Sequence, residues 1–381
     1  MRYEVAVVGL GGMGAAALAH LAGRGVEAIG IERYPRSAPG GASCGETRMI
    51  RKAYFENASY VPLLERAYDL WYELEAETDR RLIDLVGVLM VGAPERTAIA
   101  GTLRTAQEYD LPIEIFDAEQ LARRFPGTHP RPQEIGLLER QGGIVFPERA
   151  VEAMLHAAEA RGATAIFETR LERWTTHAGT HRLALDDGRT VEASRLVICP
   201  GMWAAELLAA LNLPLRVQRN VQLWFEPSTT LFDRGLFPAF FVERLELPAP
   251  LYGFPAIDGQ IKAALHGFGD LTDPERVDRR VRDGDVTIVR DALDEWIGSA
   301  ASRYARGRVC TYTLTPDGNF VVDRHPHDPS IAIACGFSGH GFKFCPVVGE
   351  ILSDLVLDGG SPYDLDFLAV DRFRSIPGLA T

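Results

Sequence analysis

Three glycines near the start of the chain, Gly9, Gly11 and Gly14, follow the spacing G-x-G-x-x-G, and Glu32 stands further along. Between a strand and a helix, such glycines allow a tight turn, the approach of a pyrophosphate to the backbone, and close packing of the helix on the strand. The free N–H groups at the helix start then attract the phosphates. A carboxylate at Glu32 can accept hydrogen bonds from both ribose hydroxyls, which argues against a 2′-phosphate. The pattern therefore predicts a site for a dinucleotide other than NADP.

A second glycine-rich loop follows the apolar run 331–335. Gly336, Gly339 and Gly341 let the backbone pass close to a flat ligand, and Lys343 precedes a helical pattern whose N-terminus would present positive charge. A flavin ring system needs such a site, because its N1–C2=O edge becomes negative on reduction. The residues alone leave a structural turn with a helix cap open as the alternative.

Composition excludes several classes of protein. The net charge is −12 with no basic tract, so nucleic acid is an improbable partner. No apolar run reaches the ~18 residues of a membrane span. The start, MRYEVAVVGLGG, enters a strand pattern at once and leaves no room for a signal peptide, so we expect a cytoplasmic protein.

Cysteine and lysine are sparse enough to examine one by one. The five cysteines stand at positions 44, 199, 310, 335 and 345 without C-x-x-C spacing, so neither a metal site nor a disulfide framework is expected. Lysine occurs only at positions 52, 262 and 343 among 40 basic residues. Most lysines in proteins are ordinary surface residues. The context of Lys262 and Lys343 in the sequence decides whether they are exceptions.

The elements that must position these residues follow from hydrophobic periodicity. The run 3–8 predicts a buried strand, 15–25 a short helix stopped by Gly25, and 27–31 a second strand, which together make a βαβ unit. A long helix is expected at 60–77. A chain of 381 residues is long enough for two domains, which can be interleaved in sequence.

Several longer segments resemble the monomeric sarcosine oxidase family, a branch of the D-amino-acid-oxidase-like flavoproteins that also holds N-methyltryptophan and pipecolate oxidases. They occur in the family's order over nearly the whole chain. The segments are GLGGMG, GETRMIRKAYFENASYVPLLERAYDLWYELE, LYGFPAIDG with Lys262 and His266 behind it, Cys310-Thr-Tyr312-Thr, and CGFSGHGFKF with Lys343.

The resemblance implies a fold and a domain division. The fold class is α/β (α+β), with a Rossmann-type FAD-binding domain interleaved with a substrate domain built on an antiparallel sheet. The FAD-binding domain is expected from residues 1–80, 141–214 and 315–381, and the substrate domain from residues 81–140 and 215–314.

The resemblance also implies a covalent flavin. Cys310 matches the family cysteine that carries FAD through a thioether to the flavin 8α-methyl group, and a thiolate can add at that position. The alternative is that Cys310 packs as a small buried apolar side chain, which is the usual role of a free cysteine. The cofactor residues implied by the resemblance are Gly9, Gly11, Gly14, Glu32, Arg33, Ser43, Arg48, Cys310, Gly339, His340, Gly341, Phe342 and Lys343.

Arg51 and Lys343 match the pair that holds the substrate carboxylate in the family. Arginine offers a planar fork that suits a carboxylate, and lysine adds a point charge. Two cations in one cavity repel each other unless an anion is present, so they favour an amino acid over a simple amine. Arg48, three residues before Arg51, is expected beside the flavin.

Lys262 matches the family lysine that activates oxygen beside the flavin, because a nearby cation stabilises superoxide. If the segment around it is a strand, His266 faces the same side as Lys262. His266, Tyr252, Tyr312 and Met49 are expected to line the amine pocket, although a lone histidine or tyrosine is more often structural.

The chain departs from the family at one point. Where the family's type member has two histidines before the G-D/E-T-R motif, this chain has Ser43 and Cys44. That weakens any role for a histidine there in flavin attachment.

The expected function is FAD-dependent oxidation of a secondary amino acid, sarcosine or a similar N-methyl amino acid, by a monomer that needs no metal. The imine product would hydrolyse to an amine and an aldehyde, with O2 reduced to H2O2. The alternative substrate is bulkier or cyclic, such as N-methyltryptophan, pipecolate or proline. Two other classes stay open: a nicotinamide-dependent dehydrogenase, favoured by the glycine motif and Glu32 alone, and a non-catalytic flavin-binding protein, against which Cys310 and the paired cations argue.

Overall fold

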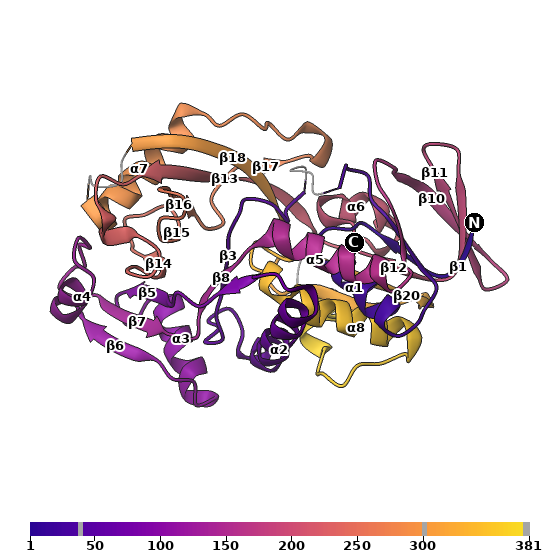
Figure 1. The fold of residues 1–381 in the computed structure, drawn as a ribbon, viewed down its shortest axis with the longest axis horizontal. Helices are drawn as coiled ribbons and strands as arrows, with labels where there is room; N and C mark the ends of the chain where they lie inside the picture. The colour runs from indigo at the N-terminus through magenta and orange to yellow at the C-terminus, as the bar shows by residue number, and fades with distance from the viewer. Residues whose placement is uncertain (37–40, 299–302, 376–381) are drawn as a thin grey trace.

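The structure is a computed structural model that describes residues 1–36, 41–298 and 303–375. In these residues the strands form two large sheets and one small sheet. The two large sheets occupy different ends of the molecule (Figure 1).

The first sheet is built around the predicted βαβ unit. β1 (Arg2–Val8) lies between β2 (Ala28–Ile31) and β12 (Thr190–Ile198), and the three strands are parallel. β9 (Thr164–Ile166) continues the parallel sheet beside β2, and β20 (Asp328–Cys335) beside β12. The antiparallel strands that extend it are β10 (Leu171–His177), β11 (Thr180–Leu185) and β19 (Val321–His325).

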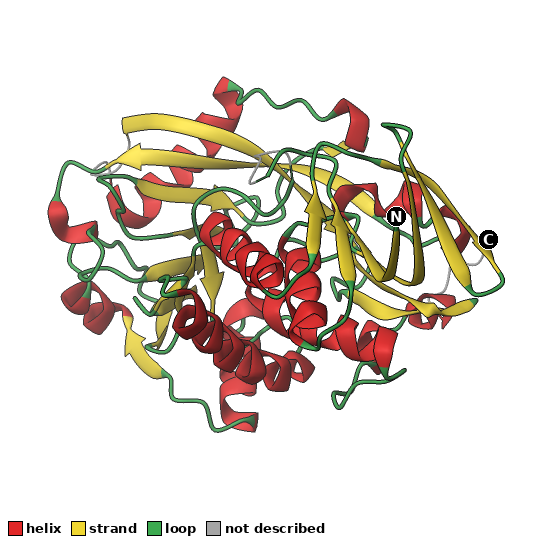
Figure 2. Ribbon diagram, turned by 45° about the vertical axis from the view of Figure 1, so that its right-hand side comes forward, coloured by secondary structure: helices red, strands yellow, loops and turns green. Residues whose placement is uncertain are grey.

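A layer of helices covers one face of this sheet, where they pack on one another (Figure 2). Strand side chains alternate between faces. Val5 and Val7 point into the helical layer, whereas Ala6 and Val8 pack in a separate apolar cluster on the other face. The helices of the layer are α1 (Gly12–Gly23), α2 (Val61–Thr78), α5 (Pro147–Ala160) and α8 (Cys345–Leu357).

Helix α1 begins earlier than the sequence predicted. Its N-cap is Gly11, so the first turn lies inside the glycine motif and not after it. The N-terminus of α1 is therefore at the place where the motif expects phosphates.

The second sheet contains the two longest strands, β13 (Arg216–Glu226) and β18 (Arg303–Leu314), which pair along almost their whole length (Figure 1). Its pairs in the described residues are antiparallel, as predicted, except that β5 (Val88–Gly92) and β14 (Ala239–Glu243) are parallel. A parallel pair needs a long connection, and these two strands come from separate stretches of chain. The other strands are β6 (Glu114–Asp117), β7 (Ile135–Glu139), β15 (Leu251–Gly253), β16 (Ile261–Leu265) and β17 (Leu271–Thr272).

Helices pack on both faces of the second sheet. α7 (Asp283–Ile297) buries Val289, Leu293 and Trp296 against one face. α3 (Thr97–Glu108) covers the other face through Ala98 and Ile99. The short helices are α4 (Ala118–Arg124) and α6 (Ala204–Leu207).

A small antiparallel sheet carries two of the predicted site residues. It consists of β3 (Arg48–Ile50), β8 (Gly143–Val145) and β4 (Ile83–Asp84), in the order β3-β8-β4. Arg48 and Met49 stand on β3 itself.

The strands of the first sheet come from the segments expected to form the FAD-binding domain, and those of the second sheet from the other two segments. The division into two domains stays a prediction that this membership supports. The last six residues expected in the FAD-binding domain, 376–381, lie outside the described part of the chain.

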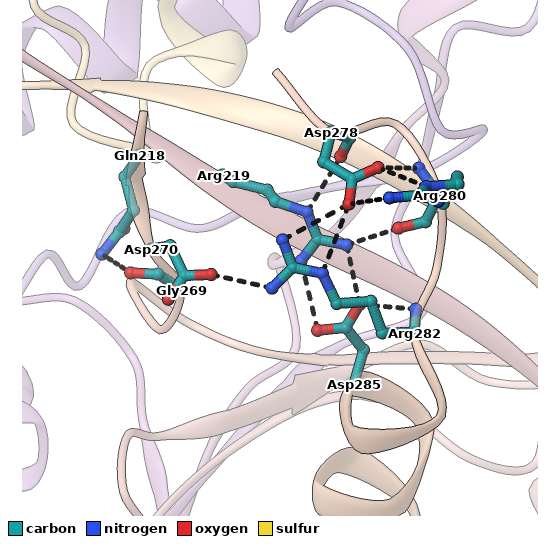
Figure 3. Close-up of polar contacts among 8 residues, drawn as sticks. All are labelled: Gln218, Arg219, Gly269, Asp270, Asp278, Arg280, Arg282 and Asp285. Atoms are coloured by element: carbon teal, nitrogen blue, oxygen red, sulfur yellow. Dashed lines mark hydrogen bonds and ion pairs between the residues drawn. The ribbon is translucent and has the colours of Figure 1, made fainter. Parts of the chain in front are cut away.

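A loop of the second sheet is fastened to β13 by a buried arginine (Figure 3). Arg219 donates to the carbonyl oxygens of Asp278 and Arg280 and forms an ion pair of 2.7 Å with Asp285 at the start of α7. The neighbouring Gln218 donates to the Gly267 and Gly269 carbonyls. The loop that Arg219 binds extends to the first sheet.

Candidate cofactor and substrate site

The predicted site residues gather around one cavity between the two large sheets, and Lys262 alone among them is not part of its lining. The predicted residues that line it are Gly9, Gly11, Gly14, Glu32, Arg33, Ser43, Arg48, Met49, Arg51, Tyr252, His266, Cys310, Tyr312, Gly339, His340, Gly341, Phe342 and Lys343. Both glycine-rich loops, which are more than 300 residues apart in sequence, thus meet at the same cavity.

The glycine motif fits a dinucleotide. Gly9 has a φ of +85°, which favours glycine, and a Cβ there would collide with the carbonyl oxygen of Cys199. A Cβ at Gly14 would collide with the Gly9 carbonyl, so the helix can lie this close to β1 only without one. The Ser43 hydroxyl accepts a 2.9 Å hydrogen bond from Gly12 N at the start of α1. Ser43 therefore fixes the helix end that would face the phosphates.

Glu32 follows β2 and is held in place by the backbone. Its carboxylate accepts hydrogen bonds of 2.7 Å from Leu10 N and 3.0 Å from Tyr34 N. Burial raises the pKa of Glu32, although these hydrogen bonds oppose that shift. The carboxylate lines the cavity beside the glycine motif, where an adenosine ribose is expected.

Arg33 lines the same end and links the two sheets. Its guanidinium stacks on Trp203, 3.9 Å from the ring centroid. Glu275, on the loop that Arg219 fastens, accepts from both Arg33 at 3.4 Å and Trp203 Nε1 at 3.1 Å. The loop of the second sheet thus closes on the end of the cavity that Arg33 lines.

The Cys310 side chain lies on β18 and lines the cavity from the second sheet. It is buried, and all five cysteines are free thiols. Burial raises the pKa of Cys310 to about 11, while the positive charges of Arg48 and Lys262 act in the opposite direction. The arrangement supplies a thiol with two nearby cations that stabilise its thiolate.

Arg48 is aimed at backbone carbonyls of the turn before it. Its guanidinium donates to the Thr47 and Ala42 carbonyls at 2.8 Å each, and also to that of Cys44. It therefore acts as a fixed positive charge at the cavity wall beside Cys310.

Lys262 differs from its expected placement. Its Nζ donates to Gly45 O at 2.7 Å, Thr47 O at 2.6 Å and Thr47 Oγ1 at 3.0 Å. Burial and the charge of Arg48 lower the pKa of Lys262, but the three oxygens around Nζ match the three N–H groups of an ammonium and favour the charged form. Lys262 and His266 were expected to face the same side of one strand. In the structure β16 ends at Leu265, before His266, and of the two residues only His266 lines the cavity.

Aromatic rings surround His266 at the cavity. Its ring centroid lies 6.2 Å from that of Tyr252 and 5.7 Å from that of Tyr312. Burial lowers the pKa of His266 to about 4, so the imidazole is neutral near pH 7. Together with Met49 these rings give the cavity a mainly apolar wall.

Arg51 has a partner that the sequence analysis missed. Its guanidinium forms an ion pair of 2.6 Å with Glu56 and donates to Ala53 O at 2.6 Å. Burial acts to raise the pKa of Glu56, but the charges of Arg51, His340 and Lys343 outweigh it and lower that pKa to about 2. The argument that the two cations need an external anion is therefore corrected, because Glu56 already supplies one negative charge.

A signal for Glu56 was present in the sequence. It is the one acidic residue in the stretch RKAYFE that begins at Arg51. Buried charges in proteins are normally paired, so a predicted buried arginine invites a search for a nearby acid. Tyr54, which contacts Lys343 and His340, had no such signal.

We expect the Arg51–Glu56 pair to make stability depend on acid. A carboxyl whose folded pKa is about 2 instead of the ordinary 4.5 stabilises the protein above pH 4.5, and that contribution is lost as the pH falls towards 2. The loss amounts to about 3 kcal/mol in the free energy of unfolding. In urea unfolding from pH 6 to pH 2.5, Glu56→Gln should lack this component and be less stable near pH 7 by ~3 kcal/mol, because Arg51 loses its buried partner.

The matched control is Glu65→Gln, on the exposed side of α2. That variant should keep the acid dependence of the native chain. Equal stability of the two variants near pH 7, or parallel pH curves for Glu56→Gln and the native chain, would contradict the assignment.

The described residues contain neither a candidate membrane span nor a candidate metal centre. Among them, no helix has the length and apolar character needed to cross a membrane. In the same residues, no group of three or more His, Cys, Asp or Glu side chains is placed to hold a metal ion.

Comparisons with known proteins agree on one family. The family model described as "FAD dependent oxidoreductase" matches residues 4–355. The chain is 40% identical to a monomeric sarcosine oxidase of Streptomyces avermitilis, over 98% of this chain and 99% of that one. It is 32% identical to an N-methyl-L-tryptophan oxidase of Yersinia pestis, over 98% and 100%. The solved structure of NikD, an unusual amino acid oxidase essential for nikkomycin biosynthesis, aligns with a TM-score of 0.86 at 23% identity over 97% of both chains, which supports the fold.

Proposed function

The chain belongs to the family of FAD-dependent oxidoreductases, and from that premise we propose that it oxidises a secondary amino acid, sarcosine or a similar N-methyl amino acid, to an imine. The imine hydrolyses to an amine and an aldehyde, which for sarcosine are glycine and formaldehyde. The carrying observation is the buried cluster of Arg51, Lys343 and Glu56 in the same cavity as Cys310 and the glycine motif.

The charge of the cluster favours a carboxylate ligand. Arg51 brings one positive charge to the cavity and Lys343, once it is protonated, a second, and Glu56 balances one of them. An amino-acid carboxylate balances the other, which makes binding of an anion favourable in this buried place. Arg51 keeps its charge at any pH used in solution, so it holds the carboxylate as a permanent cation.

The remaining residues orient the substrate and exclude water. Tyr252, His266 and Tyr312 form the apolar wall next to the carboxylate cluster, and the neutral His266 does not compete for the carboxylate. FAD bound in this cavity would supply the acceptor for the two electrons of the substrate, and its reoxidation by O2 would give H2O2. Gly9, Gly11, Gly14, Glu32, Arg33 and Ser43 would hold its adenosine and phosphates, and Arg48 with the Gly339–Lys343 loop its ring end.

The covalent link is part of the same proposal. Cys310 would carry the 8α-S-cysteinyl bond, supported by its place in the cavity wall and by the two cations that favour its thiolate. We also keep Lys262 as the residue that promotes reaction with O2, through its positive charge behind the cavity wall. The free thiols suit a reducing compartment, so we propose a cytoplasmic enzyme. The monomeric state stays a prediction.

A panel of amino acids tests the function. The purified holoenzyme is incubated with sarcosine, N-methyl-L-tryptophan, L-pipecolate and L-proline, with glycine and methylamine as controls, and H2O2 is measured. We expect sarcosine to give the highest kcat/KM and methylamine, which has no carboxylate, to give at least ~100-fold less. Absence of H2O2 with every secondary amino acid would refute the proposal.

A bulkier substrate is the second candidate. The 32% identity to an N-methyl-L-tryptophan oxidase over the full chain supports it. A higher kcat/KM for N-methyl-L-tryptophan or L-pipecolate than for sarcosine in the same panel would favour that candidate.

A further inference from the structure

Hydrogen-bond directions fix the protonation of His340 and Tyr54. His340 Nε2 lies 3.0 Å from the carbonyl oxygen of Gly318, which can only accept, so Nε2 carries a hydrogen. Burial lowers the pKa of His340 to about 3, so its other nitrogen, Nδ1, is bare near pH 7. Tyr54 Oη lies 2.5 Å from Nδ1 and must donate its single proton to it. The Tyr54 oxygen is then free only to accept.

These directions leave one open position on Lys343. Its Nζ lies 2.8 Å from His340 O and 3.4 Å from Tyr54 Oη, and both oxygens accept. A neutral amine has two N–H groups, and both are used here. The remaining tetrahedral position of Nζ belongs to the lone pair when Lys343 is neutral, and to a third N–H when it is charged. Lys343 lines the cavity, so this position is available to a ligand.

The surroundings of Lys343 disfavour a charge until an anion binds. Its side chain is 5% exposed, and the described residues give it no ion pair. Arg51, Glu56 and Tyr54 face Lys343 from the segment after β3. His340 faces it from the loop that also carries Lys343, and His266 faces it from the end of β16. The Glu56 carboxylate is already bound to Arg51. Burial and the charge of Arg51 lower the pKa of Lys343 to about 7, against the opposing charge of Glu56.

A secondary amino acid must lose a proton before it can be oxidised. In water it is a zwitterion, and its ammonium nitrogen has no lone pair with which to form the C=N bond of an imine. We propose that Lys343 is the base that removes this proton, by entering the complex as a neutral amine and leaving it charged beside the substrate carboxylate. This inference rests on the proposed function.

The transfer balances in atoms and charge. One N–H bond of the substrate ammonium breaks, its electron pair stays on the substrate nitrogen, and the lone pair of Nζ forms a new N–H bond. A neutral lysine and a zwitterion of zero net charge become a lysine of charge +1 and an amino carboxylate of charge −1. No proton comes from or goes to the solvent. The new ammonium then pairs with the carboxylate, which stabilises both.

A ligand with the carboxylate but no ammonium separates this proposal from simple electrostatic binding. Methoxyacetate has an ether oxygen where sarcosine has its nitrogen. Binding it should charge Lys343 with a proton taken from the solvent. Isothermal titration calorimetry of the holoenzyme in two buffers of different ionisation enthalpy counts that proton, and the flavin spectrum reports binding without turnover.

We expect an uptake of about 0.9 proton per site at pH 8 and about 0.1 at pH 6, since the pKa of the free lysine is about 7. The Kd for methoxyacetate should rise about tenfold between pH 8 and pH 9. Lys343→Met should abolish the uptake, whereas the matched control Lys52→Met should keep it. Tyr54→Phe removes one acceptor of the ammonium, so the midpoint of the uptake should move to lower pH.

The outcomes are distinct. Binding without proton uptake at pH 8, or uptake that persists in Lys343→Met, would overturn the role of Lys343 and leave the proposed function intact. If Lys343→Met fails to fold or to bind, the native chain and Tyr54→Phe decide through their uptake curves. Absence of methoxyacetate binding to the native holoenzyme would refute the carboxylate site, and with it the proposed function.

Discussion

Denatured native chain is expected to carry the mass of one FAD, and denatured Cys310→Ser chain is expected to carry none. Cys310 is the cysteine that the β18 backbone places in the cavity wall with Arg48 and Lys262 as its nearby cations. A serine hydroxyl has nearly the same size but ionises far less readily, so it cannot act as the nucleophile that a thiolate provides. Mass spectrometry of the intact denatured chain measures the difference directly. The yellow colour of the protein after acid precipitation should disappear with it.

Cys44 is the matched control, because it is also buried, stands near Arg48 and holds its sulfur 3.2 Å from Gly41 O. Cys44→Ser should keep the FAD mass. If Cys310→Ser keeps the mass and Cys44→Ser loses it, the attachment site is Cys44. If neither variant changes it, the proposed bond to cysteine at this end of the cavity is wrong.

Lys262→Met should slow the reaction of the reduced enzyme with O2 by about 100- to 1000-fold, the usual effect of removing one group that stabilises a developing anion. Reduction of the enzyme by substrate under anaerobic conditions should change by less than about tenfold, because Lys262 does not line the cavity. Stopped-flow absorbance of the flavin separates the two half-reactions. An artificial electron acceptor in place of O2 should restore turnover.

The hydrogen bonds of Lys262 raise a competing explanation, in which the lysine only clamps the turn at Gly45–Thr47. Thr47→Val tests it, since valine has a similar shape and removes the hydroxyl acceptor while the charge of Lys262 stays. If the charge matters, Thr47→Val keeps the rate with O2 within a few-fold of the native value. If the clamp matters, Lys262→Met should slow both half-reactions together, and Thr47→Val, which removes one of the three acceptors, should slow both to a smaller extent.

Local patterns predicted much of the fold. The strand at the N-terminus, the glycine turn, the long helix and the strand–loop–helix unit that contains Lys343 were confirmed, because each is encoded in neighbouring residues. The parallel pair of β5 and β14 was not predicted. Residues in two separate stretches of chain determine that pairing, and the hydrophobic pattern within either stretch alone does not predict it.

The site shows the same division. The residues selected by motif matching, except Lys262, line one cavity, yet Glu56, Tyr54 and the three acceptors of Lys262 were not predicted. Hydrogen-bond partners depend on where side chains meet in space, which spacing along the chain does not reveal. For the same reason nothing in the sequence indicated that Arg219 fastens a loop reaching Arg33.

The interleaved order of the two sheets has a consequence for biosynthesis. β1 pairs with β12, and β12 in turn pairs with β20, whose residues are synthesised long after those of β1. Closing such long loops is entropically costly and slows folding. Until β20 has been made, the nascent chain therefore exposes the edge of an unfinished parallel sheet, which is a site for aggregation. Chaperones that cover that edge should matter more for this protein than for one whose domains follow each other in sequence.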